Sequence, residues 1–157
     1  MNKKISFAAV VLVVVMTVCT VQILRAVDPE SKRVNGSGES PGGIVMTVSA
    51  VEHTNGDVTG HAMFHDRQTN SKLTIDVTEV IITGNRATID GEVMRTTGDY
   101  ATDCEGSHAI FVVEDNGEGN GDPVDRFTLP ACYEPGQGVK MAKPFASEMG
   151  NLQVRGS

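Results

Sequence analysis

The chain has 157 residues and a formal net charge of −7, and its aromatic residues are five Phe, two Tyr and no Trp. A chain of this length suits one domain, and its acidity disfavours nucleic acid and anionic membrane surfaces as partners. With so few aromatic residues, the core is expected to consist of Val, Ile, Leu, Met and Ala side chains.

Residues 1–26 have the pattern of a signal peptide. Lys3 and Lys4 precede an apolar run that extends from Ile5 to Val18, and Ala26 offers a small side chain at a plausible cleavage point. An uncleaved single-pass membrane anchor is the alternative, because the apolar stretch approaches the ~20 residues that a membrane helix needs. The sequence thus predicts a secreted or cell-surface protein that contacts the membrane only if this segment is retained.

Residues 27–43 are charged and rich in Ser, Gly and Pro, and they show no apolar periodicity. Such a composition is typical of a flexible linker. The folded part is therefore expected to be one β-domain over residues 44–157.

Within this domain, short apolar runs alternate with turn residues, which indicates β-strands and hairpins. Strands are predicted at 44–52, 58–66, 72–84, 86–95, 108–115, around 125–129, at 138–141 and at 151–155. No helix is predicted after residue 26. The fold class is therefore all-β, a single antiparallel β-sandwich or barrel of about eight short strands.

The first hairpin and the strand at 72–84 carry information about register. A two-residue turn at Asn55-Gly56 would place Ala50 opposite His61, whereas one extra residue would exchange the two faces, and both registers stay open. In 72–84, one face is marked by Leu73, Ile75, Val77 and Ile81. Val80 and Ile82 interrupt the polar face, which indicates a bulge or burial on both faces.

Cys104 and Cys132 are the only cysteines that lie beyond the signal segment. An even cysteine count in an exported chain predicts a disulfide between them. Closing this ~28-residue loop would stabilise the fold by about 3 to 4 kcal/mol on the loop-entropy estimate.

The acidic, glycine-rich loop between Asp115 and Asp125 is the strongest candidate for a functional site. Asp115, Glu118, Asp122 and Asp125 form a candidate set of calcium ligands, and Asn116 and Gly117 form a structural turn. The spacing does not match a helix-loop-helix calcium site. A plain turn, in which the Asp115 and Asn116 side chains accept backbone amides, is the alternative.

No catalytic residue is predicted. His61 and His65 share a strand face but would lie ~13 Å apart, too far for one metal ion. Asp76 with Asp90, or Glu79 with Glu92, could face each other across adjacent strands, as solvated carboxylate pairs often do.

Four stretches carry a resemblance to a known family: GHAMFHD, LTIDVTEVIITGNRATIDGEV, FVVEDNGEGNGDPVDRFTL and GNLQVR. They resemble the post-COAP domain family of small exported bacterial β-domains, over roughly Gly43 to Arg155. The most specific piece is the DNGE stretch that starts at Asp115, followed by the DRF stretch that starts at Asp125. The chain departs from the family in the residues after Glu118 and in the segments that carry Cys104 and Cys132. The resemblance implies an all-β fold and an exported location, and no catalytic residues.

The expected function is that of a non-catalytic binding or structural module of the cell envelope or extracellular space. Its partner would be an extracellular molecule or an envelope component, and nucleic acid is not expected. A small secreted hydrolase and a calcium-stabilised adhesion module are the alternatives, and calcium is the one cofactor that the sequence suggests.

Overall fold

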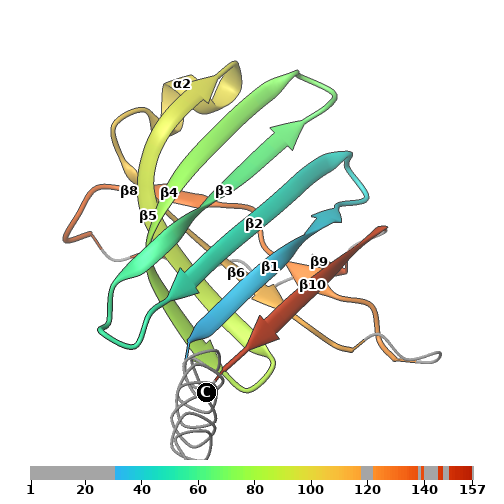
Figure 1. Cartoon of the computed structure of the whole chain (residues 1–157). Helices are drawn as coiled ribbons and strands as arrows, with labels where there is room; N and C mark the ends of the chain where they lie inside the picture. Colours follow the sequence, from blue (N-terminus) through green and yellow to red (C-terminus); the bar gives the residue numbers. More distant parts are fainter. Residues whose placement is uncertain (1–30, 118–121, 138, 140–144, 147–148, 157) are drawn as a thin grey trace, which may run out of the picture.

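A computed structural model of the chain describes residues 31–117, 122–137, 139, 145–146 and 149–156. These residues form one antiparallel sheet of ten strands, which curls into a half-barrel (Figure 1). The predicted all-β fold is thus confirmed. The strands are β1 (Lys32–Glu39), β2 (Ile44–Glu52), β3 (Val58–Asp66), β4 (Ser71–Thr83), β5 (Arg86–Thr97), β6 (His108–Glu114), β7 (Arg126–Phe127), β8 (Ala131–Tyr133), β9 (Phe145–Ala146) and β10 (Met149–Arg155).

The strand order is β10-β1-β2-β3-β4-β5-β6-β7-β9, and β8 also pairs with β6. Each consecutive pair from β1 to β6 is antiparallel. Short hairpin connections link the strands from β1 to β5, and the longer segment 98–107 links β5 to β6. The first and last of the described strands lie side by side, because β1 pairs with β10 as well as with β2 (Figure 1).

The expectation that residues 27–43 form a flexible linker is wrong for Lys32–Glu39, which is strand β1. Val34 is fully buried in the core, and Lys32 Nζ lies 2.8 Å from Glu52 Oε1 on β2. One of the glycines that suggested a linker has a structural role in this strand. Gly36 has φ +141°, and a Cβ there would overlap the carbonyl oxygen of Asn151 on β10. A glycine is therefore needed where the strands approach this closely.

The β2–β3 hairpin adopts the longer of the two registers that the sequence left open. Ala50 pairs with Gly60 and Glu52 with Val58, so five residues connect the strands. The amide of His53 donates to the carbonyl of Asp57 at 2.8 Å and closes this connection. As a result Ala50 and Ala62 face the core.

Strand β4 contains the bulge that its sequence indicated, between Val77 and Glu79. The bulge exchanges the strand's faces, so Val80 is buried after Val77. The placement of Ile81 on the buried face was therefore wrong, since its side chain is 52% exposed. Gly91 on β5 lies opposite the bulge, where a Cβ would overlap the carbonyl oxygen of Asp76.

The core fills the inside of the curled sheet, and aromatic rings matter more to it than the composition suggested. Phe64 and Phe111 meet edge to face with ring centroids 5.0 Å apart, and Phe127 is also fully buried. Such a pair contributes about 0.5 to 1.5 kcal/mol beyond its buried area. The other large, fully buried side chains are Met46, Leu73, Ile75, Ile89, Leu152, Val34, Val112, Val113 and Thr128.

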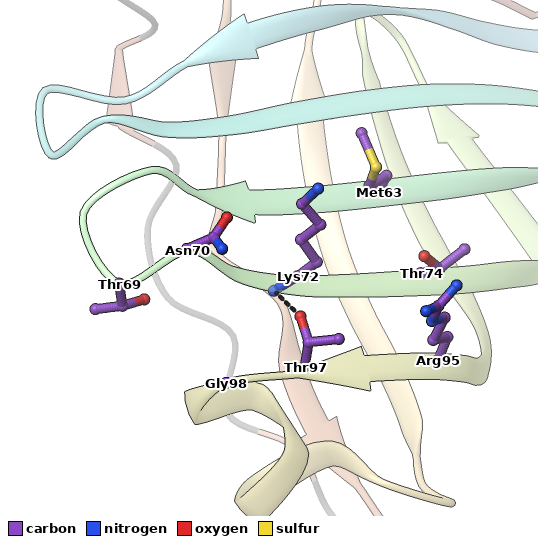
Figure 2. A pocket seen from close by; sticks show the side chains of 8 residues that line it. All are labelled: Met63, Thr69, Asn70, Lys72, Thr74, Arg95, Thr97 and Gly98. Carbon is purple, nitrogen blue, oxygen red and sulfur yellow. Dashed lines mark hydrogen bonds between the residues drawn. The ribbon is translucent and has the colours of Figure 1, made fainter.

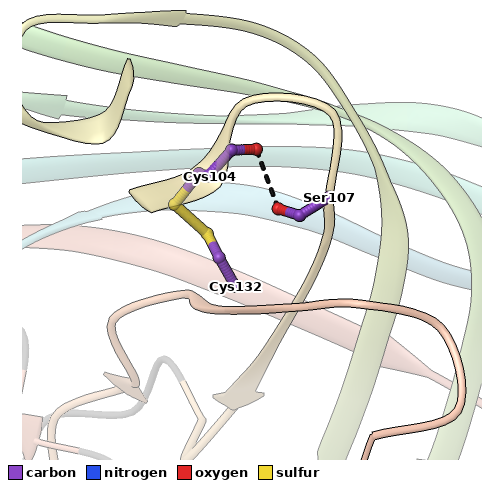
Figure 3. Close-up of a disulfide and its surroundings, with 3 residues drawn as sticks. All are labelled: Cys104, Ser107 and Cys132. Carbon is purple, nitrogen blue, oxygen red and sulfur yellow. Dashed lines mark hydrogen bonds between the residues drawn. A yellow bond between two sulfur atoms is a disulfide. The ribbon is translucent and has the colours of Figure 1, made fainter. Parts of the chain in front are cut away.

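The segment after β5 forms a short helix, α2 (Asp99–Cys104), that the sequence did not predict. The predicted disulfide joins Cys104 at its end to Cys132 on β8, with 5.3 Å between the Cα atoms (Figure 3). The Ser107 hydroxyl donates to the carbonyl of Cys104 at 2.8 Å in the same turn. The bridge thus fixes the loop after β5 against β8.

Several predictions fall on residues that the structure does not describe. They are the signal segment 1–26, residues 27–30 of the predicted linker, Glu118 in the acidic loop, and all of the strand at 138–141 except Val139. In the part of the chain that is described, no helix is long and apolar enough to cross a membrane.

Candidate functional site

The acidic loop begins at the end of β6 and is anchored to the β4–β5 turn. The amide of Asp115 donates to the carbonyl of Asn85 at 2.9 Å, and the Asn85 side-chain amide donates to the carbonyl of Asp115 at 2.9 Å. The same Asn85 amide also reaches Asn116 Oδ1 at 3.1 Å. These bonds fix where the loop leaves the sheet.

Asp115 uses both carboxylate oxygens on backbone amides. Oδ1 accepts from the amide of Gly117 at 3.0 Å, which makes an Asx turn, and Oδ2 accepts from the amide of Val154 at 3.0 Å. Val154 lies on β10, so this carboxylate reaches across the gap between β6 and the last strand.

Asp125 at the far end of the loop repeats this arrangement. Its Oδ1 accepts from the amide of Asn116 at 2.9 Å, and its Oδ2 accepts from the amide of Leu152 at 2.7 Å. Only 8% of Asp125 is exposed. Bonds from backbone amides to a carboxylate are charge-assisted, about twice as strong as neutral ones.

Together the two aspartates close the half-barrel. Leu152 and Val154 are two residues apart on β10, so their amides point to the same edge of the strand. The other edge pairs with β1. An edge strand normally presents a row of unpaired amides to other chains. Here the carboxylates of Asp115 and Asp125 cover that edge; we call them the carboxylate clamp.

Other described residues of the loop support the clamp. The Asn116 side-chain amide donates to the carbonyl of Val124 at 2.8 Å and so holds the two ends of the loop together. Gly117 has φ +96°, and a Cβ there would lie 2.8 Å from Asp122 Oδ2. Asn116 and Gly117 are therefore positioned as parts of a turn.

The calcium hypothesis stays a prediction. Of its four residues, the structure brings Asp115 and Asp125 to the same strand edge and places Asp122 beside Gly117, whereas Glu118 is outside the described residues. In the described ranges no three His, Cys, Asp or Glu side chains are grouped as a metal would require.

A second polar cluster was not predicted and lies on the outer face of β5, β6 and β8. The Tyr133 hydroxyl donates to Asp90 Oδ2, and His108 Nδ1 lies 3.2 Å from Asp90 Oδ1. The hydrogen bond to Asp90 is the main reason why the pKa of Tyr133 rises to about 12, and desolvation adds to it. Asp90 is 8% exposed and shared between two rings, so it ties β8 to the sheet.

This cluster depends on pairings that the sequence does not show. The register places His108 opposite Tyr133 and Ala109 opposite Cys132. Strand β8, which carries Cys132 of the disulfide, therefore brings the Tyr133 hydroxyl to Asp90. The paired carboxylates were also predicted wrongly. Glu79 faces Asp90 and Asp76 faces Glu92, because the β4 bulge shifts the register between these two pairs.

No family model, curated protein or solved structure matches the chain. The resemblance to the post-COAP domain family therefore stays a prediction.

Proposed function

We propose that the chain is a non-catalytic binding or structural module of the cell envelope or extracellular space. The carboxylate clamp carries the proposal. The acidic loop is the strongest candidate for a functional site in the sequence. In Asp115 and Asp125, however, both carboxylate oxygens accept hydrogen bonds from backbone amides, and one of these bonds in each residue comes from β10. Acids engaged in this way serve architecture rather than proton transfer.

An exported location is part of the proposal. The Cys104–Cys132 bridge supports it, because disulfides persist in oxidising compartments and are rare in the cytosol. The signal-like pattern of residues 1–26 points the same way.

A calcium-stabilised adhesion module is the second candidate. The position of Asp122 beside Gly117 favours it, since this places a third carboxylate at the start of the loop. Calcium accepts six to eight oxygen ligands and tolerates irregular geometry, so carboxylates that already accept amides can still contribute a lone pair.

A ligand panel tests the proposed function against the hydrolase alternative. We expect at least one envelope polymer, glycan or extracellular protein to raise the melting temperature, because a ligand that binds only the folded state stabilises it. The same preparation is assayed for ester, glycoside and peptide hydrolysis. If the chain hydrolyses a substrate and His108→Ala abolishes this activity, the proposed non-catalytic module is wrong and the protein is an enzyme.

A further inference from the structure

The outer face of β3, β4 and β5 carries a cavity of about 650 Å³ near the β3–β4 turn (Figure 2). Its wall includes Met63, Asn70, Lys72, Thr74, Arg95 and Thr97. The register aligns these residues in two rows, since Met63 faces Thr74, Thr74 faces Arg95, and Lys72 faces Thr97. The cavity is therefore built from side chains of the sheet itself.

Lys72 and Arg95 are the only charged residues of the described part that line this cavity, and both are cations. The chain as a whole has 20 acidic and 13 basic residues, so two neighbouring cations stand out against its charge. Lys32, Arg67 and Arg86 each form an ion pair with a glutamate. No ion pair within 4.0 Å involves Lys72 or Arg95 among the described residues.

The polar groups around the two cations can also donate hydrogen bonds to a ligand. Thr97 Oγ1 accepts from the amide of Lys72 at 3.0 Å, so its hydroxyl proton stays available (Figure 2). Thr74 stands directly opposite Arg95 on the same face. Asn70 has φ +54°, a conformation that asparagine tolerates better than most residues, and its side-chain amide borders the cavity.

Hydrogen bonds and a close contact at Ser71 hold the rim of the cavity together. The Ser71 hydroxyl accepts from Thr69 Oγ1 at 2.7 Å and from the amide of Asp99 at 2.9 Å, and the residue is 1% exposed. Gly98 packs so closely on Ser71 that a Cβ would overlap its hydroxyl oxygen. The β3–β4 turn and the start of α2 are thus held together, which fixes the positions of Asn70 and Thr97.

We propose that this cavity binds a phosphate-type oxyanion. The inference rests on the proposed binding function and names the ligand class. A carboxylate offers two oxygens, whereas a phosphoryl group offers three or four, which match an ammonium, a guanidinium fork and two hydroxyls. The group comes either from free phosphate or from a phosphate ester on an envelope polymer.

Phosphorus NMR with the purified whole chain tests the proposal directly. Inorganic phosphate and glycerol phosphate are titrated at constant ionic strength, and the phosphorus line is expected to broaden with either probe. The double variant Lys72→Gln/Arg95→Gln should abolish the broadening. The control Arg33→Gln/Arg155→Gln removes two exposed cations that face each other across β1 and β10, and it should broaden the line as the natural chain does.

Each outcome decides the proposal. Stronger broadening by glycerol phosphate indicates an ester as the natural ligand, and stronger broadening by phosphate indicates the free ion. Arg95→Lys keeps the charge but loses the guanidinium fork, and we expect its affinity to fall several-fold. Equal broadening in the double variant and the control, or none in the natural chain, overturns the proposal. The melting temperature is measured with phosphate and with acetate at the same ionic strength, and an equal rise with both also overturns it. If phosphate binding fails but a ligand without phosphate raises the melting temperature, the oxyanion site is wrong and the proposed binding module stands.

Discussion

Removal of the Asp125 carboxylate should destabilise the fold more than any other single change in the acidic loop. Asp125→Ala loses two charge-assisted hydrogen bonds, of 2.9 and 2.7 Å, from a residue that is 8% exposed. Hydrogen bonds to charged groups contribute about 1.5 to 3 kcal/mol each, and the bond to Leu152 is buried. For the two bonds together we therefore expect a loss of about 3 to 6 kcal/mol in the free energy of unfolding.

Urea denaturation measures this loss, and amide hydrogen exchange locates it. In the natural chain the amides of Leu152 and Val154 should exchange slowly, and Asp125→Ala should expose Leu152 first. Glu105→Ala is the control, because it removes the same charge from an exposed site and should change stability by about 0.5 kcal/mol or less. An Asp125→Ala variant as stable as the control, with Leu152 still protected, would refute the clamp.

Four further predictions concern other parts of the chain. In a Tyr100→Phe background, absorbance at alkaline pH should show Tyr133 ionising near 12, and Asp90→Asn should return its pKa toward 10. Because the folded pKa is raised, the stability that this bond gives is fully present below pH 10 and is lost as the pH rises toward 12. Cys132→Ser should cost about 3 to 4 kcal/mol in urea denaturation. The intact mass of the exported chain without residues 1–26, measured without reductant, should show no free thiol at Cys104 or Cys132. Millimolar calcium should raise the melting temperature by a few degrees and magnesium by less, and equal melting in calcium and chelator would leave only the hydrogen-bonded turn. Amino-terminal sequencing of exported protein should begin near Val27, and an intact first residue in a membrane fraction would favour the anchor.

The strands with clear alternation were predictable, because period-two burial is a local property of the sequence. Strands β4, β5 and β6 are of this kind, and the apolar residues Val80 and Ile82 even indicated the β4 bulge. Strand β1 was missed since its glycines serve a close approach between strands, and the same composition is typical of a linker.

The clamp and the outer-face cluster were not predictable for a different reason. Asp125 accepts from Leu152, which is 27 residues further along the chain, and Asp115 accepts from Val154, 39 residues away. Nothing in the spacing of an acid reveals which distant amide it will meet. The acidic loop was identified as important, but its role depends on where β10 lies. The cluster of Asp90, His108 and Tyr133 likewise requires the pairing of β6 with β8.

The pairing of β1 with β10 also determines the order in which the protein can fold. Gly36 on β1 pairs with Leu152 on β10. The hydrogen bonds on this edge of β1 can therefore form only after β10 is in place. Contacts between such distant residues slow folding, and a strand without its neighbour is open to pairing with another chain. During synthesis the amino-terminal part of a chain emerges first, so one edge of β1 stays unpaired until β10 has also emerged. Loss of β10 by premature termination would leave that edge open for good and favour aggregation.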